Sequence, residues 1–94
     1  MYFCSMKHYI IRVIGKVQGV YYRKSTQEEG LRLGVKGFVK NEEDGSVYME
    51  AEGDEESLQK LVAWCKAGPK RAEVREVRVE EGAMQNFKEF VIKR

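Results

Sequence analysis

The first forty residues combine a strand, a glycine-bracketed loop, a helix and a second strand, and this order restricts the fold to a few topologies. The β-branched run at 9–14 ends at Gly15 and predicts the first strand. A helical pattern covers about 22–33, and 35–41 predicts the second strand. A crossover of this kind returns the chain parallel to its first strand. The loop and the end of the second strand should therefore share one rim of a sheet.

The middle of the chain predicts a hairpin strand and a second helix. Residues 47–51 alternate apolar and polar side chains after an Asp-Gly turn, which is typical of a half-buried strand. Asp54 is a suitable N-cap, and apolar residues then recur at i, i+3, i+4 and i+7 between Leu58 and Cys65. Gly68 and the proline after it should end this helix.

Two further strands complete an α+β pattern. They are predicted over 74–79, with a bulge near Arg75, and over 87–92. The order βαββαβ with a short C-terminal strand is the split βαβ, or ferredoxin-like, arrangement. We therefore expect two helices packed on one face of a mainly antiparallel sheet, and 94 residues suffice for one such domain. The fold alone does not indicate a function.

A single histidine and two cysteines limit the chemistry open to this chain. His8 opens the first strand, and we expect a surface imidazole there. Cys4 and Cys65 form no C-x-x-C pair and, with His8, are too few for the four ligands of a typical zinc site. Cys65 lies on the apolar stripe and is expected to pack in the core. An enzyme of this composition must use chemistry that needs little proton shuttling.

The net charge of +2 conceals two halves of opposite sign. Residues 1–40 carry +6 and residues 41–94 carry −4, so the first half should attract a small anion or a phosphate backbone. No apolar run reaches the ~20 residues of a membrane span. The first eight residues lack the parts of a signal peptide, so we expect a cytoplasmic protein without membrane contact.

Three features meet at the predicted rim. The loop at 15–20 leads into a helix N-terminus, where free N–H groups and the helix dipole favour an anion. Arg23 stands in the first helical turn and suits phosphate oxygens, and the amide of Asn41 can both donate and accept. Each feature alone is common in ordinary turns and surfaces. On these residues alone, an anion site and a plain turn with solvated side chains are both open.

The surrounding motifs resemble the two signatures of the acylphosphatase family. Residues 15–23, Gly-Lys-Val-Gln-Gly-Val-Tyr-Tyr-Arg, resemble the first signature. Residues 37–41, Gly-Phe-Val-Lys-Asn, resemble the second, and further family positions match at Gly45, Val47 and Gly53. Tyr22 stands where the family usually has Phe, so its additional hydroxyl needs water or a partner. The resemblance divides the chain into an N-terminal extension, 1–6, and an acylphosphatase-like domain, 7–94, and translation could begin at either Met1 or Met6.

The resemblance implies a hydrolase that converts acyl phosphates to a carboxylate and inorganic phosphate without a metal or other cofactor. Arg23 would hold the phosphoryl group and Asn41 would orient the attacking water. Backbone N–H groups would complete the phosphate cradle, from Gln18, Gly19, Val20, Tyr21 and Tyr22. The implied partners are a small acyl phosphate and inorganic phosphate, which is both product and competitive inhibitor. We expect a monomer that binds no nucleic acid.

Two other functions compete with this prediction. Lys36-Gly37-Phe38 matches the start of the main motif of RRM domains, which bind RNA, and Tyr48 lies on the following strand. The later aromatic residues of that motif are missing, so the stacking platform is incomplete. The second alternative is a non-catalytic acylphosphatase-like module of a larger assembly, against which the presence of both Arg23 and Asn41 argues.

Overall fold

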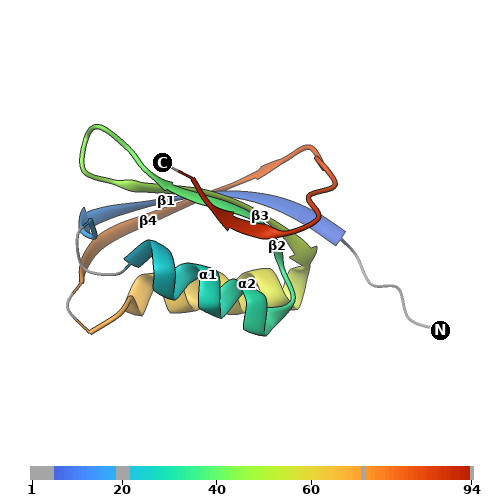
Figure 1. Ribbon diagram of the computed structural model, residues 1–94, viewed down its shortest axis with the longest axis horizontal. Coiled ribbons are helices and arrows are strands. Elements are labelled where there is room, and N and C mark those ends of the chain that lie inside the picture. Colours follow the sequence, from blue (N-terminus) through green and yellow to red (C-terminus); the bar gives the residue numbers. More distant parts are fainter. Residues whose placement is uncertain (1–5, 19–21, 71, 94) are drawn as a thin grey trace.

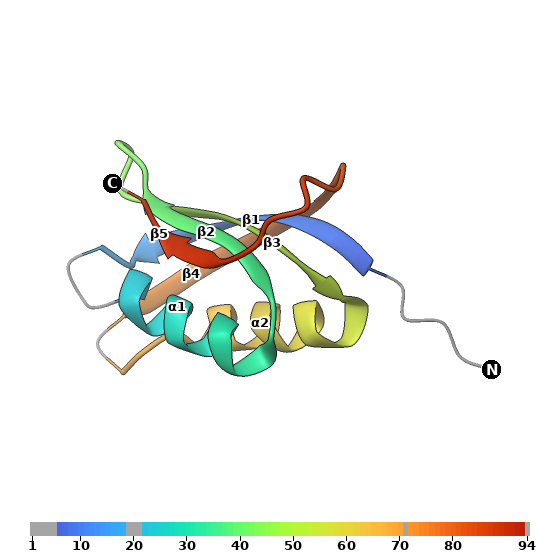
Figure 2. The ribbon, with the colours of Figure 1, turned by 45° about the vertical axis from the view of Figure 1, so that its right-hand side comes forward.

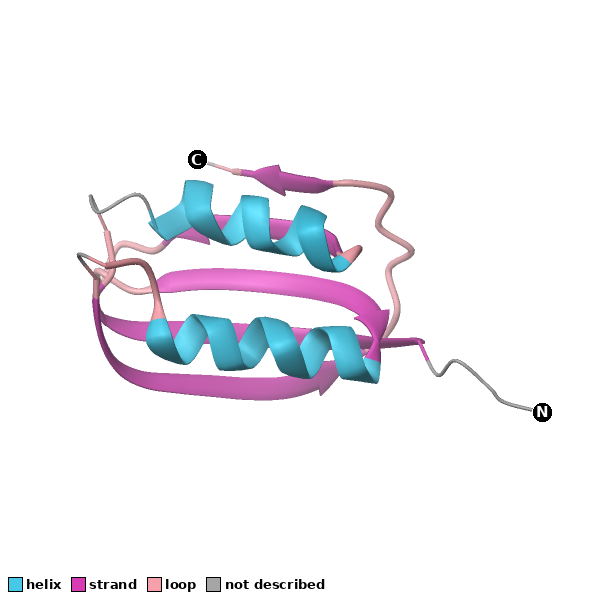
Figure 3. Ribbon diagram, turned by 90° about the horizontal axis from the view of Figure 1, so that it is seen from below, coloured by secondary structure: helices cyan, strands magenta, loops and turns pink. Residues whose placement is uncertain are grey.

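Two helices cover one face of a five-stranded sheet in the computed structural model, which describes residues 6–18, 22–70 and 72–93 (Figures 1 and 3). The elements follow the predicted order, and their bounds are β1 (Met6–Lys16), α1 (Tyr22–Leu33), β2 (Lys36–Asn41), β3 (Val47–Asp54), α2 (Glu55–Ala67), β4 (Glu73–Gly82) and β5 (Phe90–Ile92). The ferredoxin-like prediction is confirmed. No helix within the described ranges is long and apolar enough to cross a membrane.

The sheet order is β4-β1-β3-β2-β5. β3 pairs antiparallel with both β1 and β2, so those two strands run parallel to each other, as the crossover predicted. β4 forms one edge beside β1, and β5 forms the other edge, parallel to β2. The face of the sheet opposite the helices is called the open face below. The β2–β3 turn and the start of α1 lie at the same end of the molecule (Figure 2).

The core lies between the sheet and the helices, where Ile11, Met49, Leu58 and other apolar side chains are fully buried. The cap prediction is confirmed, because Asp54 accepts a 2.8 Å hydrogen bond from the backbone N–H of Ser57. Cys65 is buried as expected, and burial raises the pKa of its thiol to about 12. A thiol with so high a pKa is a packing group and a poor nucleophile.

Gly30 and Tyr22 fix the position of α1 against β5 and α2. A Cβ at Gly30 would come within 2.9 Å of the Phe90 ring, so glycine lets the helix approach β5 closely. The Tyr22 ring is buried, and its hydroxyl donates a 2.8 Å hydrogen bond to the carbonyl oxygen of Cys65 in α2. The added hydroxyl of Tyr22 therefore has a protein partner, and it ties the two helices together.

The expectation that His8 is a surface imidazole is wrong. Its side chain is buried on the open face, with Nδ1 2.6 Å from Glu52 Oε2 and Nε2 2.8 Å from Glu50 Oε1. The connection at 83–89 covers this site, because Glu52 accepts the backbone N–H groups of Gln85 and Phe87. These partners lie more than forty residues from His8 in the chain, so no local pattern indicates the burial.

The last strand is shorter than the predicted span 87–92. Only Phe90–Ile92 pair with β2, because Phe87 binds Glu52 on the open face and does not pair with the sheet edge. The N–H of Phe87 bonds to Glu52, and its ring lies 5.8 Å from that of Phe38 across the open face. Residues 83–89 are thus a cover for the open face before the chain joins the sheet edge.

Candidate active site

Asn41 ends β2 at the rim beside the start of α1. Along β2, Gly37 and Val39 are buried toward the helices while Phe38 and Lys40 lie on the open face, so alternation directs Asn41 toward the helix side. Its amide oxygen Oδ1 is buried and has no hydrogen-bond partner among residues 6–18, 22–70 and 72–93. An unpaired buried acceptor costs roughly 1–3 kcal/mol, so this oxygen is suited to accept a hydrogen bond from a ligand or water.

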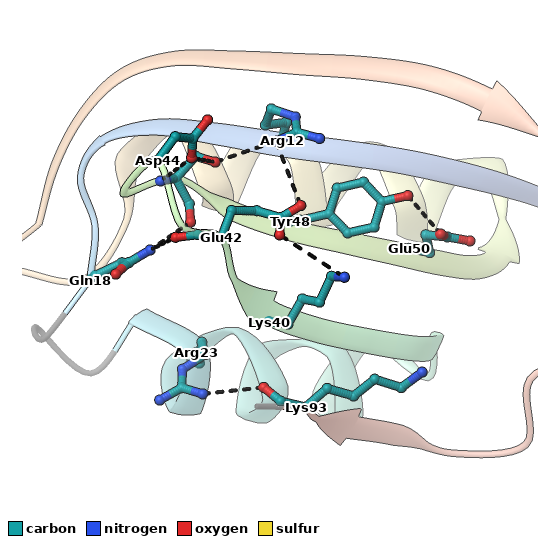
Figure 4. Close-up of polar contacts among 10 residues, drawn as sticks. Arg12, Gln18, Arg23, Lys40, Glu42, Asp44, Tyr48, Glu50 and Lys93 are labelled. Carbon is teal, nitrogen blue, oxygen red and sulfur yellow. Dashed lines mark hydrogen bonds and ion pairs between the residues drawn. The ribbon is translucent and has the colours of Figure 1, made fainter.

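Arg23 is linked to the strand that carries Asn41. Its Nη1 donates a 3.2 Å hydrogen bond to the carbonyl oxygen of Lys93 (Figure 4). The N–H of Lys93 in turn donates to the carbonyl oxygen of Val39 at 2.8 Å. Two hydrogen bonds therefore connect the guanidinium to a residue two positions before Asn41. The structure brings these two predicted site residues to one rim.

Gln18 connects the glycine loop to the turn that follows Asn41. Its Nε2 donates to the carbonyl oxygens of Glu42 at 2.8 Å and Ser46 at 2.9 Å, both in the turn that follows Asn41 (Figure 4). Val17, the preceding residue, is buried and anchors the loop in the core. The prediction used only the backbone N–H of Gln18, and its side-chain role emerges from contacts between distant segments.

The remaining cradle positions are only partly within the structure. Gly19, Val20 and Tyr21 lie outside the described residues. Tyr22 is the first residue of α1, so its N–H belongs to the helix N-terminus, although its ring turns into the core. The first turn of α1 contains no acidic residue, which leaves the positive end of the helix dipole available to an anion.

The sequence alone does not indicate the contribution of Lys93, whose carbonyl oxygen accepts a hydrogen bond from Arg23. A backbone acceptor on the last strand leaves no local signal in the sequence, because only the pairing of β5 with β2 brings it to the rim. Lys16, in the glycine loop, and Lys24, in the first turn of α1, are exposed. Within the described segments, no group of three or more His, Cys, Asp or Glu side chains could hold a metal ion.

Comparison with known families identifies the family of this chain. A family model described as Acylphosphatase matches residues 9–92. The chain belongs to the acylphosphatase family. A relative from Methylococcus capsulatus named acylphosphatase is 44% identical over 90 residues, which is 95% of this chain and 98% of the relative. Another from Pelotomaculum thermopropionicum is 53% identical over 68 residues, covering 72% and 74% of the two chains.

The fold supports the same assignment. The crystal structure of acylphosphatase from Bacillus subtilis superimposes with a TM-score of 0.91 at 35% identity, covering 96% of this chain and all of that one. Membership in the family makes this chain a hydrolase of the acylphosphatase type, with a small acyl phosphate as its substrate. The roles of its individual residues are a separate question.

Proposed function

We propose that the rim formed by Arg23, Asn41 and the loop at 18–22 hydrolyses acyl phosphates by in-line attack of water. The observation that carries this proposal is the buried amide oxygen of Asn41, which has no hydrogen-bond partner within the described part of the chain and lies at the rim that also holds Arg23. A carbonyl-type oxygen accepts a hydrogen bond from water and so directs the water's lone pair toward a phosphorus atom held opposite. Positioning of this kind is a main source of rate in phosphoryl transfer.

Arg23 and the backbone N–H groups of 18–22 hold the phosphoryl group in this proposal. The guanidinium presents several donors in one plane and matches two phosphate oxygens at once. The N-terminus of α1, with no acid in its first turn, adds the field of the helix dipole. The Lys93 carbonyl supports the guanidinium from behind, which limits the motion of a long side chain.

The leaving group explains why no histidine is needed. A departing carboxylate is the base of an acid with a pKa of about 4, so it leaves without a general acid. A phosphate oxygen with a second pKa of about 6 accepts the proton of the attacking water. His8 is occupied by two carboxylates on the open face and stands apart from this proposed sequence of steps.

The direct test is hydrolysis of benzoyl phosphate by the purified chain and its Asn41→Ala variant. We expect Asn41→Ala to lower kcat by about a hundredfold, because one pre-organised polar contact in a phosphoryl or acyl transfer site is worth ~10²–10³ in rate. Gln59→Ala, which removes an exposed amide from α2, is the matched control and should keep full activity. Full turnover by a folded Asn41→Ala chain would contradict the assigned role.

Inorganic phosphate should compete with benzoyl phosphate, since the cradle that holds the substrate also fits the product. Initial rates measured over a matrix of phosphate and substrate concentrations should show KM rising with phosphate while kcat stays constant. Inhibition that lowers kcat alone, or no inhibition at high phosphate, would count against a cradle built by Arg23 and the loop.

The remaining predictions from the sequence extend this proposal. We propose that the protein acts as a cytoplasmic monomer, uses no cofactor and binds no nucleic acid. We also propose that 7–94 is the catalytic domain and that 1–6 is an extension.

A further inference from the structure

A groove on the open face of the sheet is lined by three arginines that the proposed function does not use. Arg12 projects from β1 and Arg75 and Arg78 from β4. Gly15, at the start of the glycine loop, and Gly45 and Ser46, in the β2–β3 turn, form part of the wall. The groove has a volume of about 500 Å³. Neither Arg23 nor Asn41 belongs to its lining, so it is a second feature of the molecule.

A β-bulge aims Arg75 into this groove. Ile14 pairs with Glu76 and Gly15 pairs with Val74, so Arg75 is an extra residue in β4. Val74 and Val77 both pack against the core. Strict alternation from Val77 would put Arg75 on the helix side, and the extra residue instead places it on the open face with Arg78. The bulge predicted near Arg75 is thus confirmed, and its effect is to gather positive charge.

Two of the three arginines in the groove repel each other. Arg12 and Arg78 are direct cross-strand neighbours, and like charges in that position repel. Each has one carboxylate partner, Glu42 3.7 Å from Arg12 and Glu76 2.6 Å from Arg78.

Arg75 and the groove's single acid complete the charge pattern. Arg75 is exposed and makes no ion pair within the described residues. Asp44 is the one acid among the described lining residues, and its Oδ1 accepts hydrogen bonds from Ser46 N at 2.9 Å and Ser46 Oγ at 2.6 Å. Of the three guanidinium groups, those of Arg12 and Arg78 each have one carboxylate partner, and the guanidinium of Arg75 has none among the described residues.

The aromatic residue beside the groove is not free to stack a nucleobase. Cations lie over the Tyr48 ring, with the Arg12 guanidinium 5.2 Å and the Lys40 ammonium 5.4 Å from its centroid (Figure 4). The Tyr48 hydroxyl is bound to Glu50 at 2.7 Å. Proteins that bind single strands depend on open aromatic faces, so this surface favours recognition of phosphate over recognition of bases.

We propose that the groove of Arg12, Arg75 and Arg78 binds a chain of several phosphates, either inorganic or carried by a nucleotide. Planar guanidinium groups match phosphate oxygens in pairs, and three of them from two strands suit a chain of linked phosphates. The volume exceeds the need of one phosphate group. This site goes beyond the proposed hydrolysis and does not depend on it.

The test measures binding of inorganic tripolyphosphate by calorimetry to a full chain carrying Arg23→Ala, which disables the proposed cradle at the rim. We expect saturable binding of one equivalent. Adding Arg75→Gln or Arg78→Gln should weaken it on the order of tenfold each, since hydrogen bonds to charged groups are the strong ones. Lys66→Gln, which removes an exposed charge from α2, is the matched control and should leave the affinity unchanged.

The outcomes separate the possible ligands. Binding of tripolyphosphate supports the proposal. If ATP also binds, the groove accepts a phosphate chain carried by a nucleotide, and if ATP does not bind, it accepts only the inorganic form. Absence of saturable tripolyphosphate binding overturns it, as does an affinity unaffected by the paired Arg75→Gln and Arg78→Gln changes. Binding of a single-stranded RNA octamer without tripolyphosphate binding also overturns it, in favour of a nucleic-acid surface. Arg75→Gln in the otherwise native chain should hydrolyse benzoyl phosphate normally, which keeps this test independent of the proposed function.

Discussion

Replacing Arg23 with alanine should lower kcat/KM for benzoyl phosphate by about a thousandfold. Removal of one pre-organised donor in a site of this kind costs ~10²–10³ in rate, and an arginine that stabilises a transferring phosphoryl group contributes ~10³ or more. Arg23 supplies both donors and charge, and its hydrogen bond to the Lys93 carbonyl holds it at the rim beforehand. Steady-state hydrolysis of benzoyl phosphate by wild type and variant measures the loss.

Two further variants make this experiment specific. Arg32→Ala removes an exposed arginine from the last turn of the same helix and should leave hydrolysis unchanged. Arg23→Lys keeps the positive charge without the planar fork, so it should recover only a small part of the lost rate. A folded Arg23→Ala chain that retains a tenth or more of wild-type activity would disprove the proposed phosphate cradle.

Replacing His8 with alanine should destabilise the folded chain by about 3–5 kcal/mol, because it leaves buried charge without its partner. The His8 ring contacts both Glu50 and Glu52, so the substitution removes a polar partner from each carboxylate. Glu52 is 2% exposed and would keep only the N–H groups of Gln85 and Phe87. Urea denaturation, compared through midpoint and slope, measures the change in the free energy of unfolding.

Neighbouring changes supply the controls for His8. Lys7→Ala removes ion pairs to Glu55 and Glu81 at 3.6 and 3.4 Å, and pairs of this solvent-screened kind contribute little to stability. His8→Gln retains a donor and should lose less stability than His8→Ala. If His8→Ala costs no more than Lys7→Ala, the buried cluster does not stabilise the fold.

The effect of His8→Ala should also depend on pH. Burial alone would raise the pKa of Glu52, but hydrogen bonds from Gln85, His8 and Phe87 outweigh it, and the pKa lies below the ordinary 4.5. A carboxyl with a lowered folded-state pKa stabilises the fold above its unfolded pKa, and that contribution is lost as the pH falls. The stability gap between wild type and His8→Ala should therefore narrow below about pH 4. A gap that stays constant down to pH 3 would rule out ionised Glu52 as its source.

Local patterns in the sequence predicted most of the fold. The stripe from Leu58 to Cys65 and the cap at Asp54 correctly predicted α2, because a helix is stabilised by contacts between residues three and four apart. The crossover rule correctly predicted that β1 and β2 run parallel. β5 was predicted too long, since the pattern at 87–92 does not reveal that the N–H of Phe87 is bound by Glu52.

The candidate site was likewise predicted only in part by local patterns. Motif spacing along the chain was enough to name Arg23 and Asn41, but their support came from segments far apart in sequence. Gln18 reaches across to the β2–β3 turn, and the Lys93 carbonyl reaches Arg23 only because β5 pairs with β2. A hydrogen bond between distant segments leaves no periodicity for a local pattern to detect.

The sequence by itself determined the order of the elements, the family and the identity of the rim residues, because these depend on spacing over a few positions. Only the tertiary structure decided what each side chain meets. It placed His8 between two carboxylates beneath the 83–89 connection and left the Asn41 oxygen without a partner in the segments that the structure describes. It also gathered three arginines on the open face through a bulge in β4. Burial and electrostatic contact depend on distance in space, which the pairing of strands brings about and local sequence does not encode.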